Sequence, residues 1–180
     1  MFYTGKGDKG KSILFDCDQK VFKDDILMEA LGELDELNSF LGVIKAEIKE
    51  KEIKIKDFSF ADIIHQVQQD LFIIQAELAG ADKRLKKEKI KQLEDIINKA
   101  EKEIPPINSF AISGSSITGS KLDLARTIVR RVERRVVAVK KIDKICDNSL
   151  AYLNRLSSLF YALARLFNHK SGITEESPSY

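Results

Sequence analysis

Charged side chains border an apolar stripe in the segment Leu122–Val137. At the 100° per residue of an α-helix, Arg126, Arg130 and Glu133 fall along one edge of this stripe. An arginine keeps its proton, so such groups beside a core are costly unless they are paired or meet a ligand. The pattern therefore predicts a binding site for an anion.

The alternative is a solvated charged face whose members pair three or four residues apart. This interpretation suits Arg131 and Arg135, which point away from the apolar stripe. For Arg126 and Arg130 both interpretations stay open, and the anionic ligand is favoured.

The N-terminal segment combines glycines, lysines and hydroxyl side chains. Residues 5–12 match the G-x4-G-K-S pattern of a P-loop, but a P-loop lies between a buried strand and a helix, and no βαβ unit follows here. A P-loop NTPase fold is therefore not predicted. The glycines still let backbone N–H groups turn toward one point, and the lysines add positive charge. This composition predicts a polyphosphate cradle, with a frayed basic N-terminus as the alternative.

Length and composition predict one domain over residues 1–180, with 1–23 as a nucleotide-binding loop segment. The 30 basic and 28 acidic residues nearly cancel, which gives no reason to expect nucleic acid or an anionic membrane as a partner. Cys17 and Cys146 are isolated, as expected of free thiols in a reducing compartment. There is no apolar run typical of a signal peptide or a membrane span, so we expect a cytoplasmic protein.

Hydrophobic residues repeat with the helical period of 3.6, and strand-like alternation is nearly absent. The pattern predicts an all-α, up-and-down bundle of about five helices, similar to ferritin-like bundles. The expected helices run from Asp24 or Asp25 to Ile48, from Ser59 to Gly80, from Lys86 to Glu103, from Gly119 to Lys141 and from Ser149 to His169. Residues 1–23 and 105–118 are expected to be long irregular loops.

Metal and nucleophile chemistry has little support in the sequence. Asp62 and His65 form the sole carboxylate–histidine pair at helical spacing, whereas a di-iron bundle needs two such pairs. We expect no metal site built from protein side chains. No serine or cysteine stands in a recognisable context for activation by histidine, so a nucleophile is expected to belong to the substrate or a cofactor.

Four motifs together resemble the PduO-type ATP:cob(I)alamin adenosyltransferases over essentially the whole chain. They are Tyr3–Gly10, Leu31–Asn38, Ala125–Arg134 and Tyr152–Ser157. The resemblance implies a homotrimeric helical bundle with active sites between neighbouring subunits. It also implies transfer of the 5′-deoxyadenosyl group of ATP to the cobalt of cob(I)alamin, with release of triphosphate. Mg2+, a reductase and a B12-dependent acceptor enzyme belong to the same expectation.

The resemblance assigns roles to individual residues. Arg126 and Arg130 stabilise the leaving triphosphate, and Asp35 pairs with Arg126 and orients it. Asp35 shares its helix row with Ser39 and Gly42, which favours a buried pair over the alternative of a solvent-facing carboxylate. The expected ATP-binding residues are Tyr3, Thr4, Gly5, Lys6, Gly7, Asp8, Lys9, Gly10, Lys11, Ser12, Arg126, Arg130, Glu133, Arg134 and Asn154. The expected corrinoid-binding residues are Phe110, Asp35 and Asn38.

The loop before the fourth helix departs from the family pattern. Family members commonly read Phe, two aliphatic residues, Pro, Gly and Gly, whereas this chain has Ser113 and Ser115 in place of the proline and the last glycine. Phe110 is retained, and the resemblance places it under the corrin, where it keeps a lower axial ligand away. A hydrophobic plug between helices is its alternative role. The departure affects the expected corrinoid preference more than ATP binding.

Two further functions stay open besides the adenosyltransferase. A bundle of the same fold could deliver or sense a nucleotide or corrinoid without turnover, or its arginines could serve subunit contacts alone. Leu124 and Ile128 are apolar positions outside the main stripe. Because such positions tend to be covered by another element or subunit, they support the expected trimer.

Overall fold

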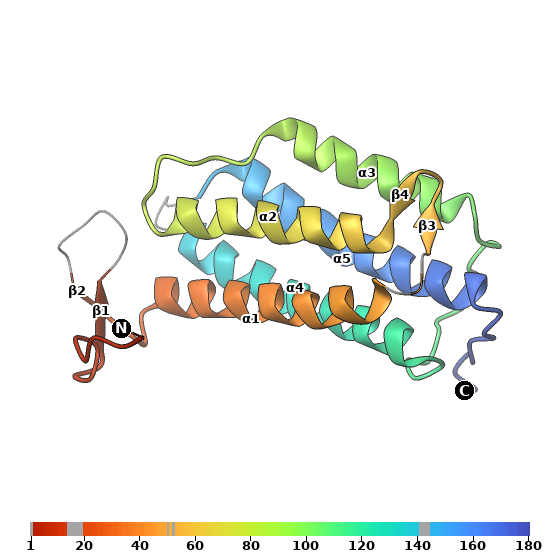
Figure 1. Cartoon of the computed structure of the whole chain (residues 1–180), viewed down its shortest axis with the longest axis horizontal. Coiled ribbons are helices and arrows are strands. Elements are labelled where there is room, and N and C mark those ends of the chain that lie inside the picture. The colour runs from red at the N-terminus through yellow and green to blue at the C-terminus, as the bar shows by residue number, and fades with distance from the viewer. Residues whose placement is uncertain (1, 14–19, 50, 52, 141–144) are drawn as a thin grey trace.

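The computed structural model describes residues 2–13, 20–49, 51, 53–140 and 145–180. Within these ranges the chain forms five helices that run alternately in opposite directions, with α3 packed on α5 (Figure 1). Their bounds are α1 Ile26–Ile48, α2 Phe60–Leu78, α3 Lys87–Glu101, α4 Ile117–Lys140 and α5 Asp147–Lys170. The predicted all-α, up-and-down bundle is confirmed.

Side chains named by the sequence pattern begin two of these helices. The Asp25 carboxylate accepts a hydrogen bond from the Leu27 N–H at 2.8 Å, and the Ser59 hydroxyl accepts one from the Asp62 N–H at 3.0 Å. Each bond satisfies an N–H group that has no partner inside its helix. The predicted starts of α1 and α2 are therefore confirmed.

The predicted apolar stripes form the core. The apolar residues that repeat at helical spacing are at most 3% exposed on α1 (Ala30, Leu34, Leu37, Leu41, Ile44, Ile48) and on α2 (Ile63, Val67, Leu71, Ile74, Leu78), and the stripe on α4 is fully buried. The stripe of α4 consists of Leu122, Ala125, Val129, Val132 and Val136. Because this stripe packs into the core, it sets the face that α4 turns outward. The charged residues at the edge of the stripe therefore lie at the surface of the bundle.

Two short hairpins were not predicted. Strands β1 (Lys11–Ile13) and β2 (Lys20–Phe22) pair antiparallel, as do β3 (Lys54–Ile55) and β4 (Phe58–Ser59). The prediction of a wholly irregular segment 1–23 is therefore wrong. Strands of two or three residues are too short for alternation to become visible in a sequence. Cys17 lies outside the described residues.

The two ends of the bundle carry different loops. The β1–β2 hairpin stands beyond the end where α1 begins and α4 finishes, set apart from the helices (Figure 1). The loop between α3 and α4, which contains Phe110, lies at the opposite end together with the C-terminus. The segments predicted to bind phosphate and corrinoid are therefore far apart in one chain.

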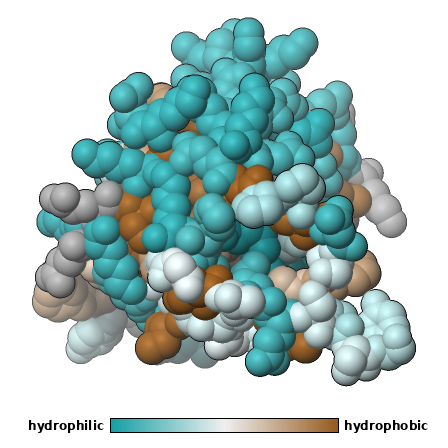
Figure 2. All heavy atoms as spheres, turned by 90° about the vertical axis from the view of Figure 1, so that its right-hand side faces the viewer, coloured by the Kyte–Doolittle hydropathy of each residue, from teal (hydrophilic) through white to brown (hydrophobic). Residues whose placement is uncertain are grey.

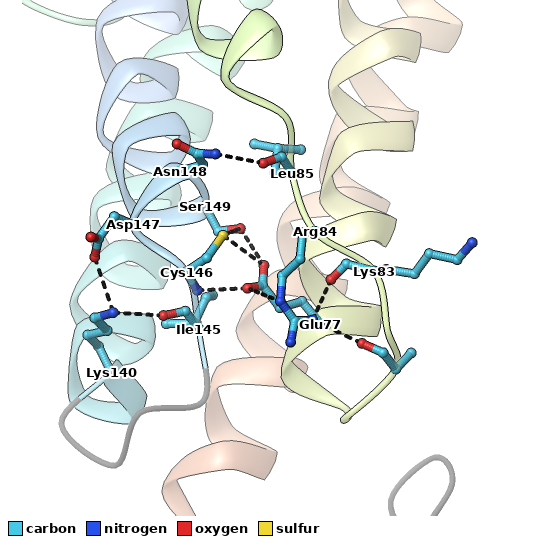
Figure 3. Close-up of polar contacts among 11 residues, drawn as sticks. Glu77, Lys83, Arg84, Leu85, Lys140, Ile145, Cys146, Asp147, Asn148 and Ser149 are labelled. Atoms are coloured by element: carbon cyan, nitrogen blue, oxygen red, sulfur yellow. Dashed lines mark hydrogen bonds and ion pairs between the residues drawn. The ribbon is translucent and has the colours of Figure 1, made fainter.

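A buried carboxylate ties the hairpin end of the bundle together. Glu77, at the end of α2, accepts hydrogen bonds from the Cys146 N–H at 2.7 Å and from the Ser149 hydroxyl at 2.5 Å (Figure 3). These donors belong to the first turn of α5, whose positive dipole end favours an anion. Arg84 approaches the same carboxylate at 3.6 Å. Glu77 thus fixes the start of α5 against the end of α2.

Among the described residues, none of the helices has the length and apolar character that crossing a membrane requires.

Candidate active site

Arg126 lies at the edge of the buried stripe on α4, as predicted. Its side chain is 32% exposed, and its Nε lies 3.7 Å from Oδ1 of Asp123, one turn earlier. The Nε atom is itself buried and donates no hydrogen bond within the described chain. Arg130, the next turn along, is exposed. Within the part of the chain that the structure describes, neither guanidinium group is hydrogen-bonded to a carboxylate.

Arg130, Glu133 and Arg134 line one surface hollow of about 240 Å³ together with Val137. Asn154 on α5 joins them, because its amide donates to Oε1 of Glu133 at 2.9 Å. The structure thus brings four of the predicted ATP-binding residues together from two helices. Two arginines and one carboxylate give the hollow a positive balance, which suits a polyphosphate.

Arg155 extends this group and was not predicted. It donates to the Asn154 side-chain oxygen at 2.9 Å and to Glu94 of α3 at 2.9 Å. Asn154 is therefore held between Arg155 and Glu133, with its amide orientation fixed. Glu94 lies 61 positions away in sequence, so no local spacing could have indicated this pair.

Arg131 and Arg135 have structural partners. Arg131 donates to Glu33 and Glu36 of α1, and Arg135 lies 3.7 Å from Glu29 of the same helix. The hydrogen bonds to Glu33 and then Glu36 raise the pKa of Arg131 above its usual value. The prediction that these arginines are paired is confirmed, but the partners belong to α1 and not to the arginines' own helix.

The N-terminal loop forms a second hollow, of about 250 Å³. It is lined by Thr4, Lys6, Gly7, Lys11, Ser12, Ile13 and Lys20. Gly5 and Gly10 have φ angles of 67° and 74°, which favour glycine because a side chain strains this backbone conformation. Lys20 was not predicted, because it enters from the returning strand β2. Tyr3, Asp8 and Lys9 belong to the same loop but do not line the hollow.

Asp35 does not pair with Arg126 inside one chain. It is exposed, and no cation contacts it in the described residues of the single chain. The reason is its helix face: the α1 side that meets α4 carries Glu29, Glu33 and Glu36, whereas Asp35 points outward. Its pair with Arg126 stays a prediction for a site between neighbouring subunits.

Asn38 faces the core side of α1. It is 5% exposed, and Gln68 of α2 donates to its backbone oxygen at 3.0 Å. Its side-chain oxygen is buried and accepts no hydrogen bond from the described residues. The corrinoid contact of Asn38 stays a prediction.

Phe110 is 76% exposed, which excludes the alternative of a hydrophobic plug between helices in the single chain. Ile107 and Ile112 of the same loop and Ile117 at the start of α4 are also exposed. Figure 2 views this end of the bundle and shows brown apolar patches among teal hydrophilic residues. The departure at Ser113 gives the loop a hydroxyl that proline lacks, and this hydroxyl donates to Asp123 at 3.2 Å.

The chain is similar to known proteins over almost its whole length. The family described as cobalamin adenosyltransferase matches residues 2–167. The chain belongs to this family. A corrinoid adenosyltransferase of Bacillus subtilis is 39% identical to it, covering 95% of this chain and 88% of the relative. One of Citrobacter freundii is 34% identical, covering 91% of this chain and 93% of the relative.

Solved adenosyltransferase structures share the fold. A phenylalanine-to-alanine variant of the PduO-type ATP:corrinoid adenosyltransferase from Lactobacillus reuteri, complexed with cobalamin and ATP, superposes with a TM-score of 0.88. It is 29% identical in sequence, and the match covers 100% of both chains. Membership of the family identifies the chemistry of this enzyme as transfer of an adenosyl group from ATP to a corrinoid.

Proposed function

We propose that this adenosyltransferase moves the 5′-deoxyadenosyl group of ATP to cob(I)alamin at a site that two copies of the chain build together. The observation that carries the proposal is the separation of the site residues in one chain. The phosphate-binding hairpin, the outward-facing Asp35 and the exposed Phe110 lie on different parts of the surface. In the proposed assembly, a neighbouring copy supplies the site residues that are missing beside each of these surfaces.

The hairpin itself supports a shared site. Apolar side chains of the hairpin and of the loop that leads into it are exposed: Phe2, Tyr3 and Phe22 are at least 58% exposed, and Ile13 is 52% exposed. A surface of this kind needs cover, and the hairpin's own bundle does not provide it. Packed on the arginine-rich hollow of another copy, the hairpin lysines and Arg130 would face one triphosphate from two sides.

The protein's task in this reaction is positioning and charge. The cobalt of cob(I)alamin donates an electron pair to C5′, the C5′–O bond breaks, and its electrons remain on the triphosphate oxygen. Negative charge therefore grows on the leaving group, where Arg126 and Arg130 stabilise it. This role explains why no activated serine or cysteine is required.

We propose that ATP enters as its Mg2+ complex. Of the described residues that line the hollow beside Arg130, Glu133 is the one carboxylate, and one or two carboxylates plus phosphates are typical Mg2+ ligands. Asn154 holds Glu133 in place through its amide. The residues therefore fit a metal bound mainly by the triphosphate, which would neutralise part of its charge.

The exposed loop end of the bundle is the proposed corrinoid side. Phe110 offers a flat apolar surface for the corrin ring, and its neighbours Ile107 and Ile112 widen that surface. Because cob(I)alamin must be supplied in reduced form, we propose that a reductase acts before this enzyme, in the cytoplasm. A B12-dependent enzyme would then accept the adenosylated product.

Incubation with ATP and chemically reduced cobalamin tests this function. We expect the absorbance change that marks formation of the cobalt–carbon bond, together with release of one triphosphate per bond formed. The control omits ATP. Binding of both ligands without bond formation would instead support a protein that delivers or senses its ligand.

A further inference from the structure

Asp123 is a buried carboxylate that the reaction as described does not use. It lies on α4, one turn before Arg126, and is 4% exposed. Burying a carboxylate is costly unless cations and hydrogen-bond donors compensate for the lost water. Arg165 of α5, equally buried, donates to Oδ2 of Asp123 at 2.6 Å. The ion pair makes the position of this carboxylate rigid.

The same carboxylate contacts two segments with different tasks. The Ser113 hydroxyl, in the loop that carries Phe110, donates to Oδ2 of Asp123 at 3.2 Å. The other oxygen, Oδ1, lies 3.7 Å from Nε of Arg126. That distance is an ion pair but too long for a hydrogen bond, and Nε has no other acceptor among the described residues. A small rotation of Arg126 would close this contact.

Arg165 has a second carboxylate partner. Its Nε lies 3.0 Å from Oε1 of Glu175, in the segment after α5, as an ion pair without a hydrogen bond. The backbone oxygen of the next residue, Glu176, accepts a hydrogen bond from the Ile112 N–H at 2.7 Å. The loop around Phe110 is thus held by Asp123 through Ser113 and by the backbone beside Glu175, and Arg165 pairs with both of these carboxylates.

We propose that Asp123 is a positioning residue for the transfer reaction, which holds the Phe110 loop through Ser113 and orients the guanidinium group of Arg126. The proposal rests on the site assigned above to Arg126 and Phe110. One rigid carboxylate then sets the spacing between the corrinoid side and the triphosphate side of the reaction. Misplacement of either group by about 1 Å is enough to slow a positioned reaction strongly.

The test compares Asp123→Asn, Ser113→Ala and Arg126→Lys in the full chain, with kcat and the two KM values measured separately. Ser113→Ala should raise the KM for cob(I)alamin and leave the KM for ATP unchanged, because it removes only the loop contact. Asp123→Asn should raise the KM for cob(I)alamin and lower kcat by about tenfold, as for loss of one charge-assisted contact.

A double-mutant cycle separates positioning from a purely structural role. If Asp123 acts through Arg126, adding Asp123→Asn to Arg126→Lys should lower kcat little further. Asp70→Asn is the matched control. Asp70 is a buried carboxylate held by Tyr152 and Lys89, and among the described residues it contacts no site residue, so its variant should lose stability but keep kcat and both KM values.

Several outcomes would overturn the proposal. Additive losses in the cycle would show that Asp123 acts independently of Arg126. Wild-type constants for Asp123→Asn beside an impaired Arg126→Lys would refute the positioning role and leave the proposed site intact. Wild-type constants for Arg126→Lys would refute the site itself. If Asp123→Asn fails to fold, an unchanged KM for cob(I)alamin in Ser113→Ala refutes the role of the loop contact.

Discussion

Arg126 carries a charge and a shape, and the two can be separated by substitution. Lysine keeps the charge but replaces the planar, bidentate fork by a point charge. We therefore expect Arg126→Lys to lose most of its activity while folding is retained, because the buried stripe beside it is unchanged. Steady-state kinetics and circular dichroism are the measurements. Arg135→Lys, whose arginine faces Glu29 on α1, is the matched control and should behave as wild type.

For individual residues, the sequence predicted which side chains belong to the candidate site better than it predicted which residues they contact. Arg130, Glu133 and Arg134 were expected together because they share a helix edge, and they do line one hollow. The partners Asp123, Arg155 and Lys20 were missed. Arg155 and Lys20 contact segments that are distant in sequence, and helical periodicity carries information only within one helix. Asp123 lies one turn from Arg126 on the same helix, so its spacing could have indicated that contact, but its pair with Arg165 of α5 could not be predicted in this way.

A pH-sensitive contact joins α1 to α4 at the loop end of the bundle. Hydrogen bonds to Glu47 from Lys121, and then from Thr118, lower the pKa of this carboxyl below its ordinary value of 4.5. The folded chain therefore binds fewer protons here than the unfolded chain. The stabilisation is present above the unfolded pKa and is lost as pH falls through the lower folded pKa.

We therefore expect the free energy of unfolding to fall more steeply between about pH 5 and about pH 3 in the wild type than in Glu47→Gln. Urea unfolding over a pH series measures this slope. Glu94→Gln removes a more exposed carboxylate outside this contact and serves as the control. Equal slopes for wild type and Glu47→Gln would contradict the assigned role of Glu47.

The N-terminal loop that leads into the β1–β2 hairpin makes a prediction at the same scale. Repulsion among its lysines Lys6, Lys9 and Lys11 and the backbone entropy of its glycines favour ordering only when an anion binds. MgATP should therefore slow proteolysis near Lys6–Lys11, and deletion of residues 1–10 should abolish ATP binding while the helical core stays intact. Limited proteolysis with and without MgATP is the measurement. Equal cleavage in both conditions would show that the hairpin does not close over the triphosphate.

The helices were predictable as elements because each has a covered apolar stripe, and the predicted bounds differ from the observed ones by only a few residues. The hairpins were not, because their short strands lack a readable period. Of the two apolar positions outside the main stripe of α4, only Leu124 supports a contact with another subunit. Ile128 is only 6% exposed and is covered by its own chain, whereas Leu124 is 50% exposed and still available for contact.

At the scale of the whole molecule, α1 offers a contact surface of its own. Gly32, Asp35, Ser39, Val43 and Ala46 form one exposed stripe along the helix. A Cβ added to Gly32 would meet nothing within 4 Å, so space for another helix is open there. Small residues allow close approach, and Asp35 in their midst would meet a cation of the neighbouring copy. We expect light scattering to report a trimer at micromolar concentration, and a stable monomer would contradict the shared site.

Complementation between inactive variants tests the shared site directly. Asp35→Ala keeps Arg126, and Arg126→Ala keeps Asp35, so each variant alone should be an inactive trimer. After subunit exchange, every mixed trimer contains one interface at which an intact Asp35 meets an intact Arg126. Random mixing in equal amounts should therefore restore about a quarter of the wild-type activity, since about three quarters of the trimers are mixed and each has one intact site in three. Native mass spectrometry verifies the exchange. Mixed trimers without activity would mean that Asp35 and Arg126 of one subunit serve the same site. The proposal of a site shared between two copies, which rests on the outward position of Asp35, would then be wrong.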